Sequence, residues 1–385
     1  MFVRRLSLTN LRCRHLLEVE LDEGLNILVG PNGAGKTTVL EAAALVLLGV
    51  PLRTSNVREV ITRDKDHLRV EIDLEEVGDG SGTAAAVTAA AAYGRDGERR
   101  ITADGAALDD ASRWKELLPV RTFAPDDLRL IKGSPRRRRE YLDSLAGRSH
   151  PEYPGTLRRY EEALSQRNHL LRTSRGGLRD CEFEPWEALL ATTGRLVSGW
   201  RAASLASFVG AFQRTHEDLT GERAENLKLV YRTNVADLDE PAYRARLAES
   251  RGPDQQRTYT HLGPHRDDLR LLRRGLDMRE CASQGEQRTA LLALVLADWE
   301  QLLAGPARPL LLLDDVMSEL DPSRRRRLIA FTRRGGQTVI TTTDLRYFSS
   351  EELEEARIVD LGPAETEAAG SEPAGGALPQ EAADG

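Results

Sequence analysis

Alternating hydrophobic and polar positions mark strands in the first part of the chain. Leu6 and Leu8 alternate with polar residues, and residues 25–29 form a short and mostly apolar run. From Leu68 to Leu74 every second residue is apolar, which is the period of a strand with one face in solvent. The opening of the chain is therefore expected to form a sheet.

A helix and a hairpin turn are predicted beside these strands. Residues 37–48 are apolar around most of the helical circumference, and the segment ends at Gly49 with Pro51 beyond it, as helices commonly do. A glycine-rich loop joins the run at 25–29 to this helix. The dipeptide Asp104-Gly105 predicts a tight hairpin turn.

Helical periodicity characterises the middle of the chain, and helices alternate with strands toward its end. Apolar residues recur at helical spacing over 135–146, 157–171 and 186–219. Strand-like patterns return at 227–231 and near Tyr259. The later predicted elements are helices at 284–303 and 323–334 and strands at 310–313, 337–341 and 357–361. Such an alternation predicts an α/β sheet.

The loop at residues 30–37 fits the phosphate-loop pattern GxxxxGK[ST] between a strand and a helix. Glycines let backbone N–H groups surround a phosphate, and the helix N-terminus adds its positive end. The lysine of such a loop reaches the β- and γ-phosphate oxygens, and the threonine hydroxyl is a ligand of Mg²⁺. We therefore predict a catalytic role for Lys36 and a metal-binding role for Thr37. The predicted ATP-binding residues are Gly30, Pro31, Asn32, Gly33, Ala34, Gly35, Lys36, Thr37 and Thr38.

Four leucines followed by two aspartates, at residues 310–315, form a second nucleotide-binding motif, the Walker B strand. Open α/β sheets present ligands at the carboxyl ends of their strands, so Asp314 is expected to face Thr37 and to hold Mg²⁺. Asp315 is then the second catalytic candidate, because it can orient or deprotonate the attacking water. Two acidic residues after a strand are common, and the pair alone would not identify a Walker B motif. The phosphate loop in the same chain favours that interpretation.

Two further segments match the signature and the D-loop of ABC-type ATPases. A serine hydroxyl and a glycine N–H group at a helix N-terminus can donate to a γ-phosphate. Taken alone, the signature segment is better explained as an N-cap with a polar first turn, and the two Walker motifs reverse that balance. The predicted D-loop contains Ser318 and Asp321. The predicted signature is Ser283, Gln284, Gly285, Glu286 and Gln287.

These motifs and the segments between them resemble the RecF family of ABC/SMC-like ATPases, up to about residue 361. The Walker and signature motifs are common to the superfamily, and it is the intervening stretches that are typical of the RecF family. They are LTNLR at 8–12, FAPDDLRLIKGSP at 123–135, QRN at 166–168 and GPHRDD at 263–268, and the signature segment itself reads SQGEQRT at 283–289.

The resemblance implies an α/β fold, namely an ABC-type ATPase head of the P-loop NTPase class with a mixed sheet, flanking helices and an inserted, mainly helical lobe. Sustained heptads are absent from the sequence, so no coiled coil is expected. The expected segments are the N-terminal part of the head at 1–105, the helical lobe at 106–254, the C-terminal part of the head at 255–362 and a disordered acidic tail at 363–385.

Three features depart from the general ABC pattern. Asp315 stands where most ABC ATPases have a glutamate, and its shorter side chain suggests slow hydrolysis. The segment Thr342-Thr343-Asp344 has no histidine at the switch position. A glutamine lid loop is not evident, and residues 125–128 are expected to take its place.

Composition and charge narrow the class of protein only slightly. The three cysteines form no CxxC pair and suggest neither a zinc site nor a disulfide. No apolar run is long enough to span a bilayer, so we expect a cytoplasmic protein with no membrane partner, and the resemblance implies that it is nucleoid-associated. The net charge of −7 includes five acidic residues in the tail, so residues 1–362 sum to −2 and DNA is compatible with the rest of the chain.

For function, the resemblance implies a weak, DNA-stimulated ATPase with ATP and Mg²⁺ as cofactors. Such a protein forms an ATP-dependent homodimer, head to tail, on double-stranded, gapped or junction DNA, and the signature of one chain serves its partner's ATP. The resemblance also implies RecR as a partner, RecO and RecA as indirect partners, and roles in recombinational gap repair, replication and the SOS response.

Two other classes carry less weight. An SMC-like chromosome-maintenance protein needs a long coiled coil between the motifs, and heptads are absent. A transporter ATPase, the least favoured class, needs a much shorter interval than the 247 residues between Lys36 and Ser283.

The sequence alone allows two interpretations of several arginines, as ligand contacts or as surface residues. Arg12, Arg14 and Arg53 flank the predicted ATP loops, where nucleotide contacts and surface salt bridges are equally compatible with the sequence. Charge runs on helices are commonly solvated faces, but basic patches also bind DNA. The candidate DNA contacts are Arg136, Arg137, Arg138 and Arg139.

Overall fold

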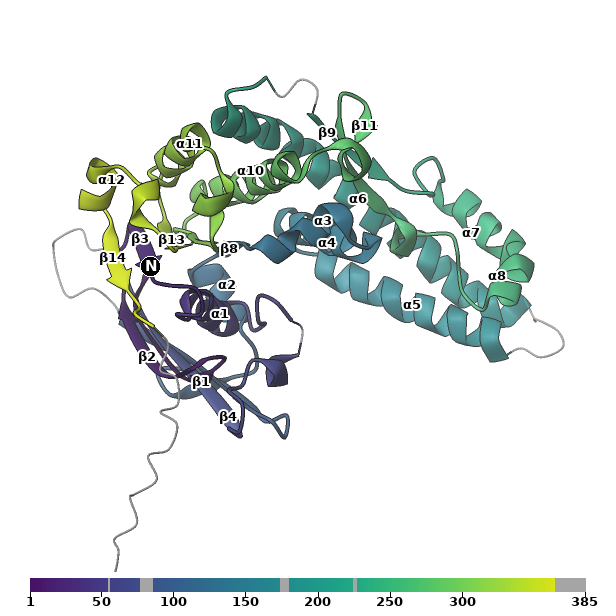
Figure 1. The fold of residues 1–385 in the computed structure, drawn as a ribbon. Coiled ribbons are helices and arrows are strands. Elements are labelled where there is room, and N and C mark those ends of the chain that lie inside the picture. The colour runs from purple at the N-terminus through teal and green to yellow at the C-terminus, as the bar shows by residue number, and fades with distance from the viewer. Residues whose placement is uncertain (55, 77–85, 174–179, 224–226, 364–385) are drawn as a thin grey trace, which may run out of the picture.

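The computed structural model describes residues 1–54, 56–76, 86–173, 180–223 and 227–363 of the 385-residue chain. In Figure 1 two sheets and their helices form a head at the left, and long helices extend from it to the right. The predicted α/β head with an inserted helical lobe is confirmed. The tail predicted from residue 363 lies almost entirely outside the described residues.

One sheet of the head is antiparallel, in the order β2-β1-β4-β5-β6-β7. The alternation around residue 70 places Leu68, Val70 and Leu74 on the buried face of β4. Asp104 and Gly105 form the predicted hairpin turn with φ angles of 48° and 80°, which match the twist of the flanking strands. The strands are β1 (Phe2–Leu11), β2 (Arg14–Glu20), β4 (His67–Glu75), β5 (Ala86–Gly94), β6 (Arg99–Ala103) and β7 (Ala106–Leu108).

The second sheet of the head is parallel, in the order β14-β3-β13-β12-β8. Helix α1 (Lys36–Leu47) packs against strands of both sheets, which explains why its sequence is apolar all round. The strands are β3 (Leu25–Val29), β8 (Val120–Phe123), β12 (Leu310–Leu313), β13 (Gln337–Thr342) and β14 (Arg357–Asp360).

The boundary between head and lobe differs from the expected one at residue 106. β7 pairs with β6, and β8 runs parallel to β12 with Phe123 beside Leu313, so both strands belong to the head. The helix between them is α2 (Ser112–Leu117). The lobe therefore begins after Phe123. Periodicity did not reveal this, because a four-residue buried strand is too short to show a pattern.

The lobe is built on two long helices, α5 (Tyr153–Thr173) and α6 (Asp180–Thr220). Arg167 contacts Glu187 near one end of the pair and Tyr153 contacts Arg201 toward the other, so the helices are antiparallel. The other lobe elements are α3 (Arg129–Lys132), α4 (Pro135–Ser149), β9 (Leu227–Arg232), α7 (Glu240–Glu249), α8 (Arg251–Arg257), β10 (Asp268–Arg273) and β11 (Leu276–Asp277). The lobe therefore extends beyond its expected end at residue 254, because β10 pairs with β9 and β11.

The strand expected near Tyr259 is wrong. The chain turns there after α8, and Thr258 is the C-cap of that helix in a left-handed conformation with φ 64°. The strand lies later, at β10, which pairs with β9 and β11 in a small antiparallel sheet.

Helix α10 (Gln284–Leu303) connects the head to the lobe. It packs against α6 of the lobe and β8 of the head. Asp298 on α10 pairs with Arg121 of β8 and with Arg148 of α4. The remaining helices are α9 (Met278–Cys281), α11 (Pro322–Thr332) and α12 (Ser350–Glu354). Among the described residues, no helix is both long and apolar enough to cross a membrane.

Candidate nucleotide-binding site

The phosphate loop follows β3 and leads into α1. Gly33 and Gly35 have φ angles of 82° and 83°, a left-handed conformation in which glycine avoids strain. A Cβ atom on Gly35 would also lie 3.0 Å from the side chain of Arg14. Buried Arg14 donates to the carbonyls of Ala34 (2.6 Å) and Leu361 (2.7 Å), so it braces the loop against the chain after β14.

Lys36 lies at the start of α1 and is buried. Its Nζ donates to the carbonyl oxygens of Gly30 (2.7 Å) and Pro31 (2.9 Å), so the ammonium group is held over the loop. Burial lowers the pKa of Lys36, and the nearby carboxylates of Asp315 and Asp314 act in the opposite direction. A phosphate in the loop would provide stronger acceptors than these neutral carbonyls.

The predicted metal-binding residues meet at the carboxyl end of β12. The Thr37 hydroxyl donates to Asp314, with Oγ1 2.8 Å from Oδ1 and 3.1 Å from Oδ2. Thr341 donates to the same carboxylate at 2.9 Å, and Asp314 is 2% exposed. A hydroxyl and a buried carboxylate at the end of a strand fit Mg²⁺, which is usually bound through one or two carboxylates plus substrate phosphates.

Asp315 occupies a left-handed position directly after the strand, with φ 48°. Its backbone N–H donates to the Thr341 hydroxyl at 2.8 Å, which fixes the turn. Its Oδ1 is buried and has no hydrogen-bond partner among the described residues. This carboxylate can therefore accept a hydrogen bond from water or ligand in the pocket.

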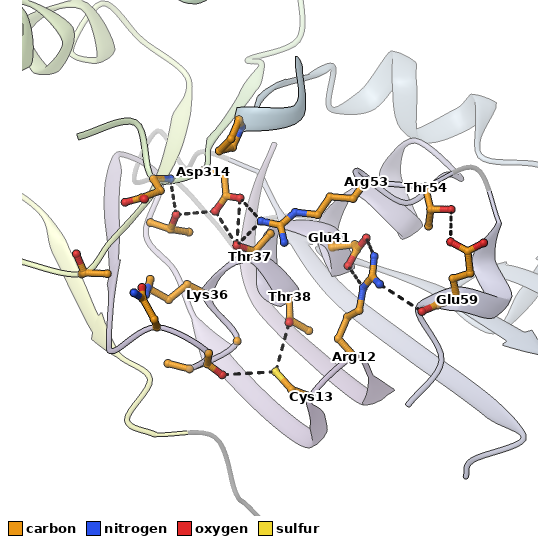
Figure 2. Close-up of a pocket in the computed structure, with 18 residues that line it drawn as sticks. Arg12, Cys13, Lys36, Thr37, Thr38, Glu41, Arg53, Thr54, Glu59 and Asp314 are labelled. Atoms are coloured by element: carbon orange, nitrogen blue, oxygen red, sulfur yellow. Dashed lines mark hydrogen bonds and ion pairs between the residues drawn. The ribbon is translucent and has the colours of Figure 1, made fainter. Parts of the chain in front are cut away.

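These residues line one pocket of about 600 Å³ (Figure 2). Arg12, for which the sequence allowed a nucleotide contact or a salt bridge, lines this pocket and forms a bidentate pair with buried Glu41 at 2.7 and 2.9 Å. Arg53 reaches Asp314 and Thr37 from the loop after α1. The lining residues are Arg12, Cys13, Asn32, Gly33, Ala34, Gly35, Lys36, Thr37, Thr38, Glu41, Arg53, Thr54, Glu59, Pro125, Asp314, Asp315, Thr341 and Thr343.

The 3-10 turn η2 (Pro125–Leu128) lies where the sequence analysis placed the substitute for a lid loop. Pro125 lines the pocket, and Asp127 is half-buried. Asp127 accepts a hydrogen bond from the Ala124 N–H at 2.8 Å, but burial dominates and raises the pKa of Asp127 to about 6. The neighbouring Asp314 adds to this increase.

The signature segment opens α10, as predicted. Ser283 and Glu286 form a reciprocal capping box: the Ser283 hydroxyl accepts from the Glu286 N–H at 3.3 Å, and the Ser283 N–H donates to the Glu286 carboxylate at 2.8 Å. Gln287 is buried and donates to the carbonyls of Met278 and Ala282. Of the described residues, those that line the pocket include none from the signature.

The D-loop follows Asp315. The Ser318 hydroxyl donates to the carbonyl of Asp315 at 3.0 Å, and Asp321 caps α11 by accepting from the N–H groups of Ser323 and Arg324. Glu319 between them is ion-paired with Arg288 of α10. These contacts link the predicted D-loop to Asp315 and to α10.

The four candidate DNA contacts on α4 divide into two groups. Arg136 and Arg137 are exposed, and Arg136 pairs with Glu140 on the same helix. Arg138 is 5% exposed and pairs with Asp268 while also donating to the Gly133 carbonyl, so it is a packing residue and its prediction as a DNA contact is wrong. Half-buried Arg139 donates to the carbonyl of Asp267.

The chain is similar to known proteins over nearly its whole length. The family model of the RecF/RecN/SMC N terminal domain matches residues 2–358. The DNA replication and repair protein RecF of Heliobacterium modesticaldum is 36% identical over 93% of this chain and 96% of its own length. The corresponding protein of Moorella thermoacetica is 33% identical over 93% and 94%.

Solved structures lead to the same family. The recombination mediator protein RecF of the RecFOR pathway, solved as RecF-ATP, is 28% identical and superposes with a TM-score of 0.77 over 90% of this chain and 93% of its own. An Smc head bound to part of ScpA, 16% identical with a TM-score of 0.52 over 90% of both chains, supports the fold alone. The chain belongs to the RecF family of DNA replication and repair proteins.

Proposed function

We propose that this protein is an ATP-dependent DNA-binding protein of the RecF type. ATP binding joins two heads on DNA, and slow hydrolysis releases them. The observation that carries the proposal is the meeting of Thr37 and Asp314 at 2.8 Å beside Lys36, in a chain of the RecF family. The residues brought together are those that ATP and Mg²⁺ require.

The pocket supplies the groups that bind the phosphates and position the attacking water. Lys36, the loop N–H groups and the N-terminus of α1 bind and neutralise the phosphates. Asp315 holds the attacking water through its unpartnered carboxylate oxygen and is able to accept its proton. Bound Mg²⁺ supplies charge neutralisation at the transferring phosphoryl group, and Thr37 with Asp314 would hold it.

We propose that the second half of each site comes from another copy of this chain. Ser283 and Gly285 are exposed at the N-terminus of α10, and neither lines the pocket of its own chain. A helix N-terminus binds anions, so these groups suit the γ-phosphate of a partner that is docked head to tail.

For DNA structure and partners, the proposal follows the family. The preferred DNA is gapped or has a junction of single and double strands, and the partners are RecR and, indirectly, RecO and RecA. An SMC-like role in chromosome maintenance is the alternative. It predicts ATP-dependent DNA binding without a preference for gaps.

The proposal is tested by DNA retardation with ATP, ADP or no nucleotide, on duplex, single-stranded and gapped DNA at two salt concentrations. We expect retention only with ATP and most strongly on gapped DNA. Lys36→Ala should remove both ATP binding and retention. Equal retention in all nucleotide states would contradict the proposal.

Shared sites are tested by mixing two inactive chains, Lys36→Ala and Ser283→Arg. A mixed dimer carries both lesions in one composite site and leaves the other intact, so part of the ATP hydrolysis should return. If cross-linking shows mixed dimers that do not hydrolyse ATP, then either Ser283 acts within its own chain or hydrolysis requires both sites to be intact.

A further inference from the structure

Arg53 places a cation directly on the two residues that fit Mg²⁺. Its Nη2 donates to Asp314 Oδ2 at 2.9 Å and to Thr37 Oγ1 at 3.2 Å. Figure 2 shows its side chain reaching them from the side of the pocket opposite Lys36. The Arg53 side chain is 46% exposed and that of Asp314 only 3%, so the arginine is free to turn away while the carboxylate stays in place.

Both oxygens of the Asp314 carboxylate are engaged by these contacts. Oδ1 accepts from Thr341, Oδ2 accepts from Arg53, and the single Thr37 hydroxyl proton is shared between the two oxygens. A divalent cation with its water ligands needs lone pairs of the same hydroxyl and carboxylate. Two cations so close together in a partly buried site repel each other strongly. Arg53 and a divalent cation therefore exclude one another.

Without nucleotide, the protein supplies few ligands for a divalent cation. Within the part of the chain that the structure describes, no group of three or more His, Cys, Asp or Glu side chains could hold a metal ion. Mg²⁺ usually completes its shell with water and substrate phosphates. Nucleotide phosphates would supply these oxygens, and they would also accept the displaced guanidinium, because Arg53 and Lys36 line the same pocket.

We propose that Arg53 makes divalent-metal binding conditional on nucleotide. It holds Asp314 and Thr37 until phosphates arrive, then yields to the cation and pairs with the phosphates. This inference rests on the proposed function, because it assumes that the pocket binds ATP. It assigns Arg53 as a residue that determines when the metal binds, and not as a catalytic residue.

The test is a Mn²⁺ titration, followed by electron paramagnetic resonance, with no nucleotide, ADP or ATP. Arg53→Gln keeps N–H donors and removes the charge, and Arg53→Met removes both. In the absence of nucleotide, both variants should bind Mn²⁺ at least about tenfold more tightly than the wild type, since a resident cation no longer opposes the metal. Arg53→Lys should retain the nucleotide requirement.

Two controls assign the effect to this site. Arg63→Gln changes an exposed arginine outside the pocket and should leave Mn²⁺ binding unchanged. Combining Arg53→Gln with Asp314→Asn should abolish the gain. If Arg53→Gln and Arg53→Met, both folded by thermal melting, bind Mn²⁺ like the wild type without nucleotide, the inference is wrong. Fluorescent ATP binding by the wild type is measured separately, and its absence would overturn the proposed function instead.

Discussion

The lobe and the nucleotide pocket both bury charged groups, but they complete their hydrogen bonds differently. In the lobe, Arg167 is 0% exposed and lies between the carboxylates of Glu187 and Asp254. Its other donors reach the Thr260 hydroxyl and the Leu247 carbonyl. The lobe arginine thus finds all its acceptors within the protein.

The pocket groups have partners that a ligand can replace. Lys36 donates to two loop carbonyls, Arg53 is half-exposed, and Asp315 keeps a buried oxygen without a partner among the described residues. A buried charged group whose hydrogen-bond partners all come from the protein therefore supports the fold. A charged group whose partners are neutral or exposed can instead exchange them for a ligand. Substitutions in the two regions should therefore affect different measurements.

The largest expected effect comes from the lobe. Arg167→Met removes the buried cation that lies between Asp254 and Glu187. Glu187 keeps its pair with Arg251, but buried Asp254 loses its arginine, which should lower the free energy of unfolding by about 3–5 kcal/mol. Urea denaturation measures this loss. The matched control Arg172→Met removes an exposed arginine from the same helix and should change stability by less than about 0.5 kcal/mol. Equal stabilities would remove the distinction between the two regions.

The pocket should show the reverse behaviour. Asp315→Asn keeps Asp314 and Thr37, so ATP should still bind, but hydrolysis should slow by roughly 10²-fold because the amide cannot accept the water's proton. Steady-state phosphate release and fluorescent ATP binding measure the two quantities. Glu319→Gln is the control, because Glu319 is paired with Arg288. Normal turnover in Asp315→Asn together with slow turnover in Glu319→Gln would transfer the catalytic role to Glu319.

Sequence reasoning located the parts of the site that are contiguous in the chain. These parts are short local motifs, and the residue types within each motif indicate its chemistry. They are the phosphate loop, the aspartates after β12 and the capping box at Ser283. The contacts that complete the site are not local: Arg53 meets Asp314 across 261 residues, and Arg14 meets Leu361 across 347. Neither partner can be chosen from one sequence, because many carboxylates and carbonyls are equally available along the chain.

In the fold, too, local patterns were predictable and long-range pairings were not. Long periodic helices such as α5 and α6 and the alternating strand β4 were predictable, because each repeats its pattern over several turns or pleats. β8 and the true position of β10 were not. The Arg167 shell also escaped prediction, since it joins α5, α6 and α8, which meet only after folding.

A smaller effect should separate the arginines of α4. Arg138→Met breaks the pair with Asp268 and should cost about 2–3 kcal/mol of stability by urea denaturation, because Arg138 is buried. Changing Arg136 and Arg137 together to Gln should leave stability nearly unchanged, since both are exposed. If they contact DNA, that double variant should bind all sequences more weakly and with a shallower salt dependence. Unchanged DNA affinity would exclude both as contacts.

The smallest net effect is a pair of opposing pH dependences, one from each region. His265 in the lobe has its pKa lowered to about 4 by burial. Its Nδ1 lies 2.6 Å from the Tyr160 hydroxyl and its Nε2 2.8 Å from the Thr260 carbonyl, which suits a neutral ring. Since the unfolded chain takes up this proton first, the stability due to His265 is complete above about pH 6.5 and falls as the pH drops toward 4.

Asp127 beside the pocket acts with the opposite sign. Its folded pKa of about 6 lies above the unfolded value, so the folded state holds the proton more tightly, and the stability due to Asp127 is lost as the pH rises through 6. Between pH 4 and 6 the two contributions, each on the order of 2 kcal/mol, nearly cancel in the wild type. His265→Gln should therefore gain stability on acidification relative to the wild type, and Asp127→Asn should lose it. Urea denaturation at pH 4, 5 and 6 compares slopes, so a constant loss of stability in either variant does not interfere. If the free energy of unfolding changes with pH in the same way in all three proteins, neither group titrates as its burial implies. Proton binding would then not distinguish the lobe from the pocket.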